Sequence, residues 1–205
     1  MKELFEEALF HIWSGRVEND GFNTLILAAG ISWQRIVILR AYYKYMKQID
    51  FLFSQSFIEE CLLRNAHIST QLIELFRHIF DPKTPDNDPR TNKLLSAVEK
   101  DIDQVEKSED DTILAQYVNL ISATLRTNYF QRTKIGELKE YLIFKFNASM
   151  IQNLPSPRPE FEMFIYSPVF EAVHLRTGKV ARGGLRWSDR REDFRKEILG
   201  LMKAQ

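Results

Sequence analysis

Near its C-terminus the chain reads Lys179-Val-Ala-Arg-Gly-Gly-Leu-Arg-Trp-Ser-Asp-Arg-Arg-Glu-Asp-Phe-Arg195, a stretch with two adjacent glycines and five arginines. An extended piece leads to Gly183-Gly184, where we expect a turn between a strand and a helix. Asp189 then suits a helix N-cap, with Glu192 three residues later as its capping-box partner. The apolar face of the predicted helix comprises Phe194, Ile198, Leu201 and Met202. That face is still incomplete at Gln205, so we expect the helix to continue in a longer protein.

The residues before this stretch favour β-structure. Tyr141–Phe146 is rich in β-forming residues, and two further strand-like runs follow at Phe161–Tyr166 and Val169–Leu175. Pro155–Pro159 is a proline-rich linker, because three prolines in five positions do not propagate a helix or a sheet. Thr177-Gly178 is typical of a tight turn. We therefore predict several strands ahead of the last helix.

The first two thirds of the chain favour helices. Apolar residues recur there at helical spacing, and the segments are separated by Gly15, Gly30 and the loop Asp81–Pro89. Ser32 and Ser56 are the expected N-caps of two of these helices. The predicted buried stripes are Phe5, Leu9, Ile12 and Trp13; Ile36, Leu39, Arg40 and Tyr43; Phe57, Ile58, Cys61 and Leu62; Leu72, Leu75, Phe76 and Ile79; Leu94, Leu95, Val98, Ile102 and Val105; and Leu114, Val118, Ile121 and Leu125. The pattern predicts an α+β chain, with a helical region at residues 1–135 and a strand-rich region at 136–205.

The amino-acid composition indicates which partners, which cellular compartment and which metal sites are expected for this chain. Lys plus Arg and Asp plus Glu each number 28, so the net charge is zero and favours neither nucleic acid nor a membrane surface as a partner. One cysteine, Cys61, allows no internal disulfide and fits the reducing cytoplasm. No apolar run approaches the roughly 20 residues that span a bilayer. His11, His67 and His78 show no ligand spacing with one another or with Cys61, so no metal site is expected. All three tryptophans, at positions 13, 33 and 187, are expected to pack in a core.

The glycine pair is surrounded by arginines, and two interpretations stay open from the residues alone. Arginine pairs bidentately with carboxylates, and glycine lets a ligand approach the backbone, so the segment describes a small-anion site. In the commoner alternative, Gly183-Gly184 is a turn or bulge and the arginines alternate with acids on a solvated, salt-bridged face. The arginines are Arg182, Arg186, Arg190, Arg191 and Arg195.

The segment Arg182-Gly-Gly-Leu-Arg-Trp-Ser-Asp-Arg-Arg-Glu-Asp-Phe-Arg195, with Glu197-Ile-Leu-Gly-Leu-Met-Lys-Ala-Gln205, resembles a signature of the large NAD-dependent glutamate dehydrogenases. The resemblance covers nearly the whole chain and is densest from Phe161 onward. Further stretches similar to that family are Phe164-Ile-Tyr-Ser-Pro168, Val173-His-Leu-Arg176, Trp13-Ser-Gly-Arg-Val-Glu-Asn-Asp-Gly-Phe-Asn23 and Leu39-Arg-Ala-Tyr42.

The resemblance implies an activity and a set of substrate-binding residues. These enzymes oxidatively deaminate L-glutamate to 2-oxoglutarate and ammonia and pass hydride to NAD. Smaller glutamate dehydrogenases bind substrate with a Lys-Gly-Gly-x-Arg motif, which Arg182, Gly183, Gly184 and Arg186 match, except that Arg182 replaces the lysine. Gln205 falls where the following helix of those enzymes supplies a glutamine to the substrate. Residues 136–205 would then form the opening strands and first helix of an α/β catalytic domain.

The resemblance also implies what lies outside this segment. The catalytic lysine is expected beyond Gln205, and Lys203 does not match it. NAD is expected on a downstream domain, since the chain contains no Gly-x-Gly-x-x-Gly after a strand. We therefore expect an interior piece that is inactive alone, within a full-length enzyme that forms a homo-oligomer. The alternative is a non-catalytic interaction or regulatory domain, built from the amphipathic helices of residues 1–127. His174 is expected to be either a neighbour of the substrate or a strand histidine bonded to backbone.

Overall fold

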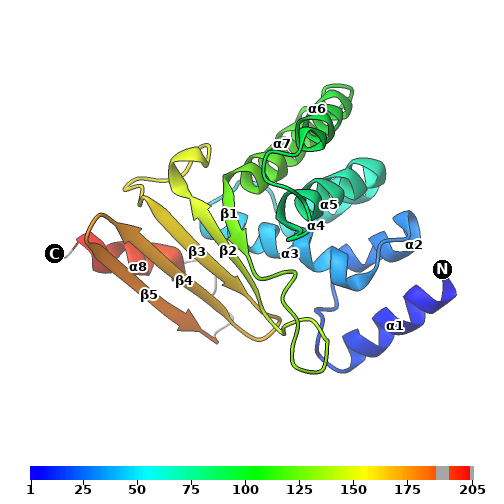
Figure 1. Cartoon of the computed structure of the whole chain (residues 1–205), viewed down its shortest axis with the longest axis horizontal. Helices are drawn as coiled ribbons and strands as arrows, with labels where there is room; N and C mark the ends of the chain where they lie inside the picture. The colour runs from blue at the N-terminus through cyan, green and yellow to red at the C-terminus, as the bar shows by residue number, and fades with distance from the viewer. Residues whose placement is uncertain (188–193, 204–205) are drawn as a thin grey trace. The chain divides into compact units, whose positions relative to one another are not determined.

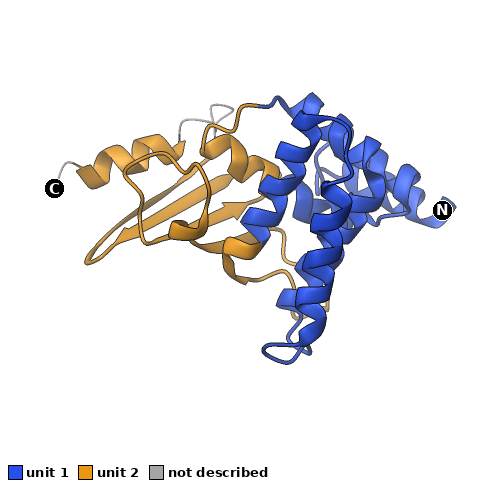
Figure 2. Ribbon diagram, turned by 90° about the horizontal axis from the view of Figure 1, so that it is seen from above, with its two compact units in different colours: residues 1–40, 53–121 blue, residues 41–52, 122–205 orange. Residues whose placement is uncertain are grey.

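A computed structural model describes residues 1–187 and 194–203. They group into two compact units, one of residues 1–40 with 53–121 and the other of residues 41–52 with the chain from 122 onward (Figure 2). The predicted helix cap at Asp189 and its partner Glu192 lie outside the described residues. The domain division expected at residue 135 stays a prediction.

The first unit is helical, as predicted from its periodicity. Asp88 caps one helix by accepting a hydrogen bond from the backbone N–H of Arg90 at 2.9 Å, and Pro89 is that helix's first residue. Gly30 ends another with a left-handed φ of 63°. The elements are α1 (Lys2–Trp13), the 3-10 helix η1 (Gly21–Thr24), α2 (Leu25–Ala29), the first half of α3 (Trp33–Gln48), α4 (Gln55–Arg64), α5 (Ala66–Phe80), α6 (Pro89–Ile102) and most of α7 (Ser108–Ala123) (Figure 1).

Some predicted details of these helices are wrong. The N-cap of α4 is Ser54 rather than Ser56, since its hydroxyl accepts a hydrogen bond from the Phe57 N–H at 3.3 Å. Helix α6 ends at Ile102, so Val105 lies beyond its stripe. Helix α7 ends at Ala123, and Leu125 belongs to a strand, where its side chain is exposed. Pairing with a neighbouring strand ends α7 earlier than its apolar pattern suggests.

The expected burial of the tryptophans is largely wrong. In α1 only Ala8 is buried, while Phe5 and Leu9 are exposed and Trp13 is 89% exposed. Trp187 is 67% exposed and lies against the Phe170 ring. Trp33 is half-buried, and its Nε1–H donates to Glu7 Oε1 at 3.1 Å. The spacing of apolar residues therefore predicted helix α1 but not which of its faces is covered.

The second unit contains a five-stranded antiparallel sheet in the order β1-β2-β3-β4-β5. Strands that follow one another in sequence are neighbours in the sheet, which is what short connections produce. The α+β class is confirmed, although β1 was not predicted. The bounds are β1 (Thr124–Thr127), β2 (Leu142–Asn147), the 3-10 helix η2 (Ala148–Met150), β3 (Phe161–Tyr166), β4 (Glu171–Thr177), β5 (Val180–Arg186) and helix α8 (Phe194–Lys203).

One face of this sheet carries the core of the second unit. Tyr42, from the second half of α3, stacks on Phe144 with ring centroids 4.2 Å apart, and Tyr45 stacks on Phe146 at 4.3 Å. Phe144, Phe164, Val173 and Gly184 are paired in turn across β2, β3, β4 and β5, so they lie on one face of the sheet. Helix α8 covers β4 and β5 on this same face. This arrangement places the glycine pair of β5 beside α8.

Candidate functional site

Gly183 and Gly184 lie inside strand β5 and not in a turn between a strand and a helix, which corrects the prediction. Gly183 pairs with His174, Gly184 pairs with Val173, and the ladder continues to Arg186 opposite Glu171. The turn of this hairpin is instead at Gly178, whose φ is 54°, as the Thr177-Gly178 pattern predicted. The sheet therefore holds the glycine pair in extended conformation.

Close packing explains why both positions are glycine. A Cβ atom on Gly184 would lie 3.0 Å from Cζ of Phe194 and 3.4 Å from Cδ1 of Ile198, both on α8. A Cβ atom on Gly183 would lie 2.9 Å from the Val173 carbonyl oxygen and 3.0 Å from Cδ2 of His174. The glycines thus let a helix and a neighbouring strand approach β5 more closely than an alanine would allow.

Alternation along β5 places Arg182, Gly184 and Arg186 on the side of the sheet that α8 covers. Arg182 is half-buried, and its Nη1 donates to the Ala181 carbonyl oxygen at 2.9 Å. Arg186 forms an ion pair with Glu197 of α8, and its guanidinium lies 5.0 Å from the centroid of the Phe194 ring. The two arginines share a face, but their Cα atoms are about 13 Å apart along the strand.

The remaining predicted arginines and Gln205 are only partly placed. Gln205, Arg190 and Arg191 lie outside the described residues, which end at Lys203 in α8. His174 is half-buried on the opposite face of the sheet, next to Gly183. The structure therefore brings Arg182, Gly184 and Arg186 together on one strand face, with Gly183 directed to the other.

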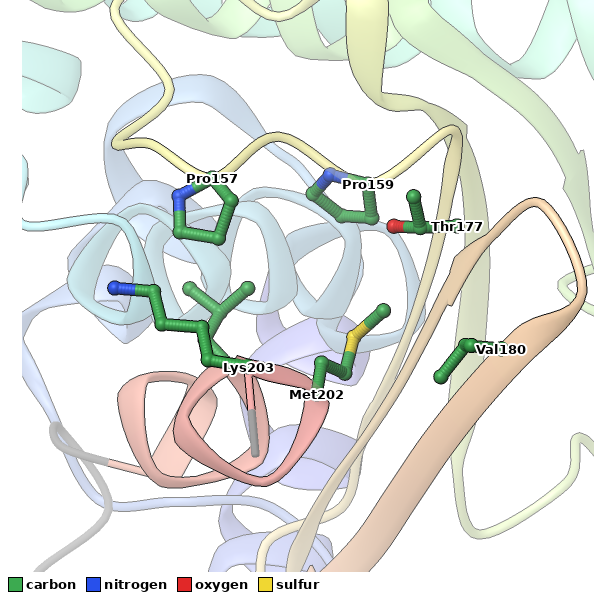
Figure 3. A pocket seen from close by; sticks show the side chains of 7 residues that line it. Pro157, Pro159, Thr177, Val180, Met202 and Lys203 are labelled. Atoms are coloured by element: carbon green, nitrogen blue, oxygen red, sulfur yellow. The ribbon is translucent and has the colours of Figure 1, made fainter. Parts of the chain in front are cut away.

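A pocket of about 200 Å³ lies on the same face, at the start of β5 (Figure 3). Its polar groups are the Thr177 hydroxyl and the Lys203 ammonium, which suit at most one anionic group of a ligand. Val180 belongs to the wall and precedes Arg182 by two residues, on the same side of the strand. The full lining is Pro157, Pro159, Thr177, Val180, Leu199, Met202 and Lys203.

A buried ion pair lies under the first turn of α8, and the sequence did not reveal it. Arg195 is 1% exposed and donates from Nε to Oε2 of Glu162, which is fully buried in β3, at 2.9 Å; a second bond joins Nη2 to Oε1. Tyr45 donates its hydroxyl to the same Oε2 at 2.7 Å. Burial, reinforced by the charge of Glu162, raises the pKa of Tyr45 well above its usual value, so its hydroxyl stays a donor. Arg195 is therefore not part of a solvated arginine face.

Gln48 and Glu171 extend this cluster. The Gln48 Nε2 donates to Glu171 Oε2 at 2.9 Å, and its Oε1 accepts a hydrogen bond from the backbone N–H of Arg195 at 3.0 Å. The pattern Phe161-Glu-Met-Phe-Ile-Tyr166 contained a signal for it. Period-two alternation puts Glu162 on the same face as Phe164 and Tyr166, so a buried face there requires a cation for Glu162.

Two further observations concern metals and membranes. Within residues 1–187 and 194–203, no three or more His, Cys, Asp or Glu side chains are grouped as a metal ion would require. None of the helices in the part of the chain that the structure describes is both long enough and apolar enough to cross a bilayer.

The chain is similar to proteins of one family along its whole length. The family model for the catalytic domain of bacterial NAD-glutamate dehydrogenase matches residues 97–205, and the model for helical motif 3 of glutamate dehydrogenase matches residues 17–82. An NAD-specific glutamate dehydrogenase of Halomonas elongata is 47% identical over 205 residues, covering 100% of this chain and 13% of the relative. Proteins of the same description from Mycobacterium tuberculosis and Pseudomonas aeruginosa are 48% identical over 204 residues and 46% over 209, covering 98% and 100% of this chain. The chain spans 13% of the length of each of these relatives.

Proposed function

Because this chain belongs to the bacterial NAD-glutamate dehydrogenase family, we propose that it is part of an enzyme that oxidatively deaminates L-glutamate. The products are 2-oxoglutarate and ammonia, and the hydride passes to NAD. The observation that carries the proposal is the 47% identity across the entire chain, which includes the Arg182–Arg186 strand and helix α8. Since the chain spans 13% of its relatives, the activity is proposed for the full-length protein.

The proposed contribution of this segment is to bind the substrate carboxylates. Glutamate carries two carboxylates, and guanidinium groups are natural partners for them because they donate two parallel hydrogen bonds. Arg182, Gly183, Gly184, Arg186 and Gln205 are the proposed substrate-binding residues. Arg186 would have to exchange Glu197 for a substrate carboxylate. The wall of the neighbouring pocket has too few polar groups for both carboxylates, so we assign it no more than one end of the substrate.

The described residues do not fit NAD. A dinucleotide is bound where parallel strands alternate with helices, whereas all neighbouring strands described in this chain are antiparallel. Hydride transfer therefore belongs to other parts of the full-length enzyme. NAD and the lysine that handles protons are proposed to be supplied by other parts of the full-length enzyme, the lysine from beyond Gln205.

The test uses the full-length enzyme with glutamate and NAD. We expect glutamate-dependent formation of NADH, and we expect Arg182→Ala to raise the KM for glutamate roughly tenfold or more, as loss of a charged hydrogen-bond donor implies. Arg176→Ala is the matched control, because Arg176 is an exposed arginine of the same hairpin on the opposite face of the sheet. A full-length protein that does not reduce NAD with glutamate would refute the assignment.

A second candidate role concerns the helical unit. The exposed apolar side chains of α1 favour a packing surface for other parts of the full-length protein, which agrees with an interaction or regulatory function.

We also propose that the full-length enzyme is a cytoplasmic homo-oligomer that works without a nucleic-acid or membrane partner. The buried thiol of Cys61 supports the cytoplasmic location, and the zero net charge of this chain supports the absence of a nucleic-acid or membrane partner. Sedimentation of the full-length enzyme tests the oligomeric state.

A further inference from the structure

Four buried side chains connect the first turn of α8 to the sheet and to α3, and we call them the α8 anchor: Arg195, Glu162, Tyr45 and Gln48. Arg195 and Glu162 form the two-bonded ion pair, and Tyr45 donates to the oxygen that also receives the Arg195 Nε–H. All four are at most 1% exposed. The side chains of the anchor are therefore shielded from solvent, and a displacement of one partner would leave a buried charge unpaired, which is energetically costly.

Gln48 bonds the backbone of α8, whereas Glu162 bonds the Arg195 side chain. The backbone N–H of Arg195, the second described residue of α8, is bonded by a side chain from outside the helix. The Gln48 Oε1 accepts this N–H at 3.0 Å, while the Gln48 Nε2 is held by Glu171 of β4. Glu171 is the residue opposite Arg186 in the β4–β5 ladder. The start of α8 is thus tied to the strand pair that carries the proposed substrate-binding residues.

Helix α8 packs closely against β5, so a small displacement of the helix would disturb the contacts between them. Phe194, which precedes Arg195, approaches Gly184 so closely that one added methyl carbon would lie 3.0 Å from its ring. Glu197, two residues after Arg195, pairs with Arg186. A shift or rotation of the first turn of α8 would therefore move groups in contact with two of the proposed substrate-binding positions.

Stability alone is a weak reason for such a cluster. The cost of removing an ion pair from water offsets most of its attraction, and well-packed apolar residues often replace such a pair without loss of stability. A bidentate pair is instead selective for geometry, because both hydrogen bonds form in only one relative orientation of the two side chains.

We propose that the α8 anchor is a positioning device for glutamate binding, with Arg195, Glu162, Tyr45 and Gln48 as positioning residues that hold α8 in register with the Arg182–Arg186 strand. This inference rests on the proposed function. It assigns these four residues no contact with substrate. They act through the placement of β5 and α8, in the way that supporting residues hold a binding site to within fractions of an ångström.

The experiment measures the KM for glutamate, the KM for NAD, kcat and the melting temperature of the full-length enzyme. Arg195→Lys keeps the charge but loses the fork, Glu162→Gln keeps the shape but loses the charge, and Tyr45→Phe removes one hydroxyl. We expect the first two to raise the KM for glutamate roughly tenfold to a hundredfold, since small displacements of binding groups have effects of that size. Tyr45→Phe should give a smaller rise in the same direction. The KM for NAD should change less than twofold in all three.

Lys196→Ala is the control variant, since Lys196 follows Arg195 but forms a surface ion pair with Asp50 at 2.7 Å. It should match the wild type in every parameter. A lower melting temperature with an unchanged KM for glutamate, or an equal rise in both KM values, overturns the positioning role. Tyr45→Phe decides the matter if the charge variants do not fold, because losing one hydroxyl leaves the packing intact. A wild-type enzyme without glutamate-dependent NAD reduction refutes the proposed function itself, whereas an active wild type with unaffected variants refutes only the anchor.

Discussion

Gly184 is a position at which one added methyl group should affect both the stability of the fold and the binding of glutamate. In Gly184→Ala the new Cβ would lie 3.0 Å from the Phe194 ring, so α8 or the ring must move. Overpacking of this kind costs about 1–3 kcal/mol, and we expect a lower melting temperature together with a higher KM for glutamate. Thermal unfolding and steady-state kinetics of the full-length enzyme measure both effects.

Gly200 provides the matched control within α8. A Cβ atom there would meet nothing within 4 Å, and the residue is exposed in the helix interior. Gly200→Ala should therefore stabilise the protein by about 0.5–1 kcal/mol through helix propensity, with kinetics unchanged. If both alanine variants behaved alike, close packing at Gly184 would not be the reason for its glycine.

Arg186 has two possible partners, and mutating each side of its ion pair separates them. If Arg186 exchanges Glu197 for substrate, Arg186→Ala raises the KM for glutamate, whereas Glu197→Gln releases the guanidinium and leaves the KM equal or lower. We expect this result, with a rise of roughly tenfold for Arg186→Ala. An equal rise in KM in both variants, and no further rise in the double variant, would mean that Arg186 only ties β5 to α8.

At this scale the sequence predicts residue types better than their partners. The glycine pair and its neighbouring arginines stood out because their composition is unusual, and the structure places three of those residues on one strand face. The burial of Arg195 was not predicted, because its partner Glu162 is 33 residues away and Tyr45 is 117 residues from Glu162. Charges that alternate along a short segment resemble a solvated face until a distant strand and helix cover one of them.

Among the helices, α4 and α7 are joined by a charged contact that should control acid stability. The buried carboxylate of Asp110 accepts hydrogen bonds from Arg64 at 2.6 and 3.1 Å and from Asn65 at 2.9 Å. Burial opposes ionisation of this carboxyl, but the bonds from Arg64 and Asn65 outweigh it, and the pKa of Asp110 is lowered. A lowered pKa means that this contact stabilises the fold above the unfolded-state pKa of about 3.9 and is lost as the pH falls through the folded-state pKa.

Asp110→Asn should therefore destabilise the protein by about 2 kcal/mol at pH 7, with the difference shrinking as the pH approaches 2. Urea unfolding at a series of pH values measures this. Asp111→Asn is the control, because Asp111 is the exposed neighbour in the same first turn of α7 and should have little effect at any pH. A difference between Asp110→Asn and the wild type that stays constant with pH would contradict the role of the charge.

Elements with a strong period and clear breakers could be predicted, and those defined by distant pairing could not. Strand β3 occupies the predicted range Phe161–Tyr166, and α5 ends before Pro82 as expected. Strand β1 was missed because Thr124–Thr127 follows α7 directly, without a glycine or proline to mark the change. Its extended conformation depends on pairing with β2, some 20 residues later, which no local pattern encodes.

Across the whole molecule, helix α3 contributes to both compact units. Its residues up to Arg40 belong to the helical unit, where Arg40 is buried and pairs with Asp20 at 2.7 Å. From Ala41 onward it belongs to the sheet unit, where Tyr42 and Tyr45 stack on β2. The sequence predicted one continuous helix but not that its two halves serve different cores, because the side chains that cover them come from distant segments.

The exposed apolar face of α1 and the zero net charge together predict how this chain behaves in solution. Phe5, Leu9 and Trp13 follow one another at four-residue intervals on one side of the helix, and Phe10 is also exposed. With a formal charge of zero and an isoelectric point near 6.9, charge repulsion does little to keep copies apart at neutral pH.

Sedimentation of the 205-residue chain at pH 7 should therefore show self-association, and Phe10→Ser with Trp13→Ser should reduce it. Leu52→Ser, which replaces a single apolar residue that is 94% exposed, should leave the association unchanged, because only a contiguous apolar face provides enough area. Equal association of all three proteins would mean that α1 is not an association surface, which would remove the support for the packing role of the helical unit.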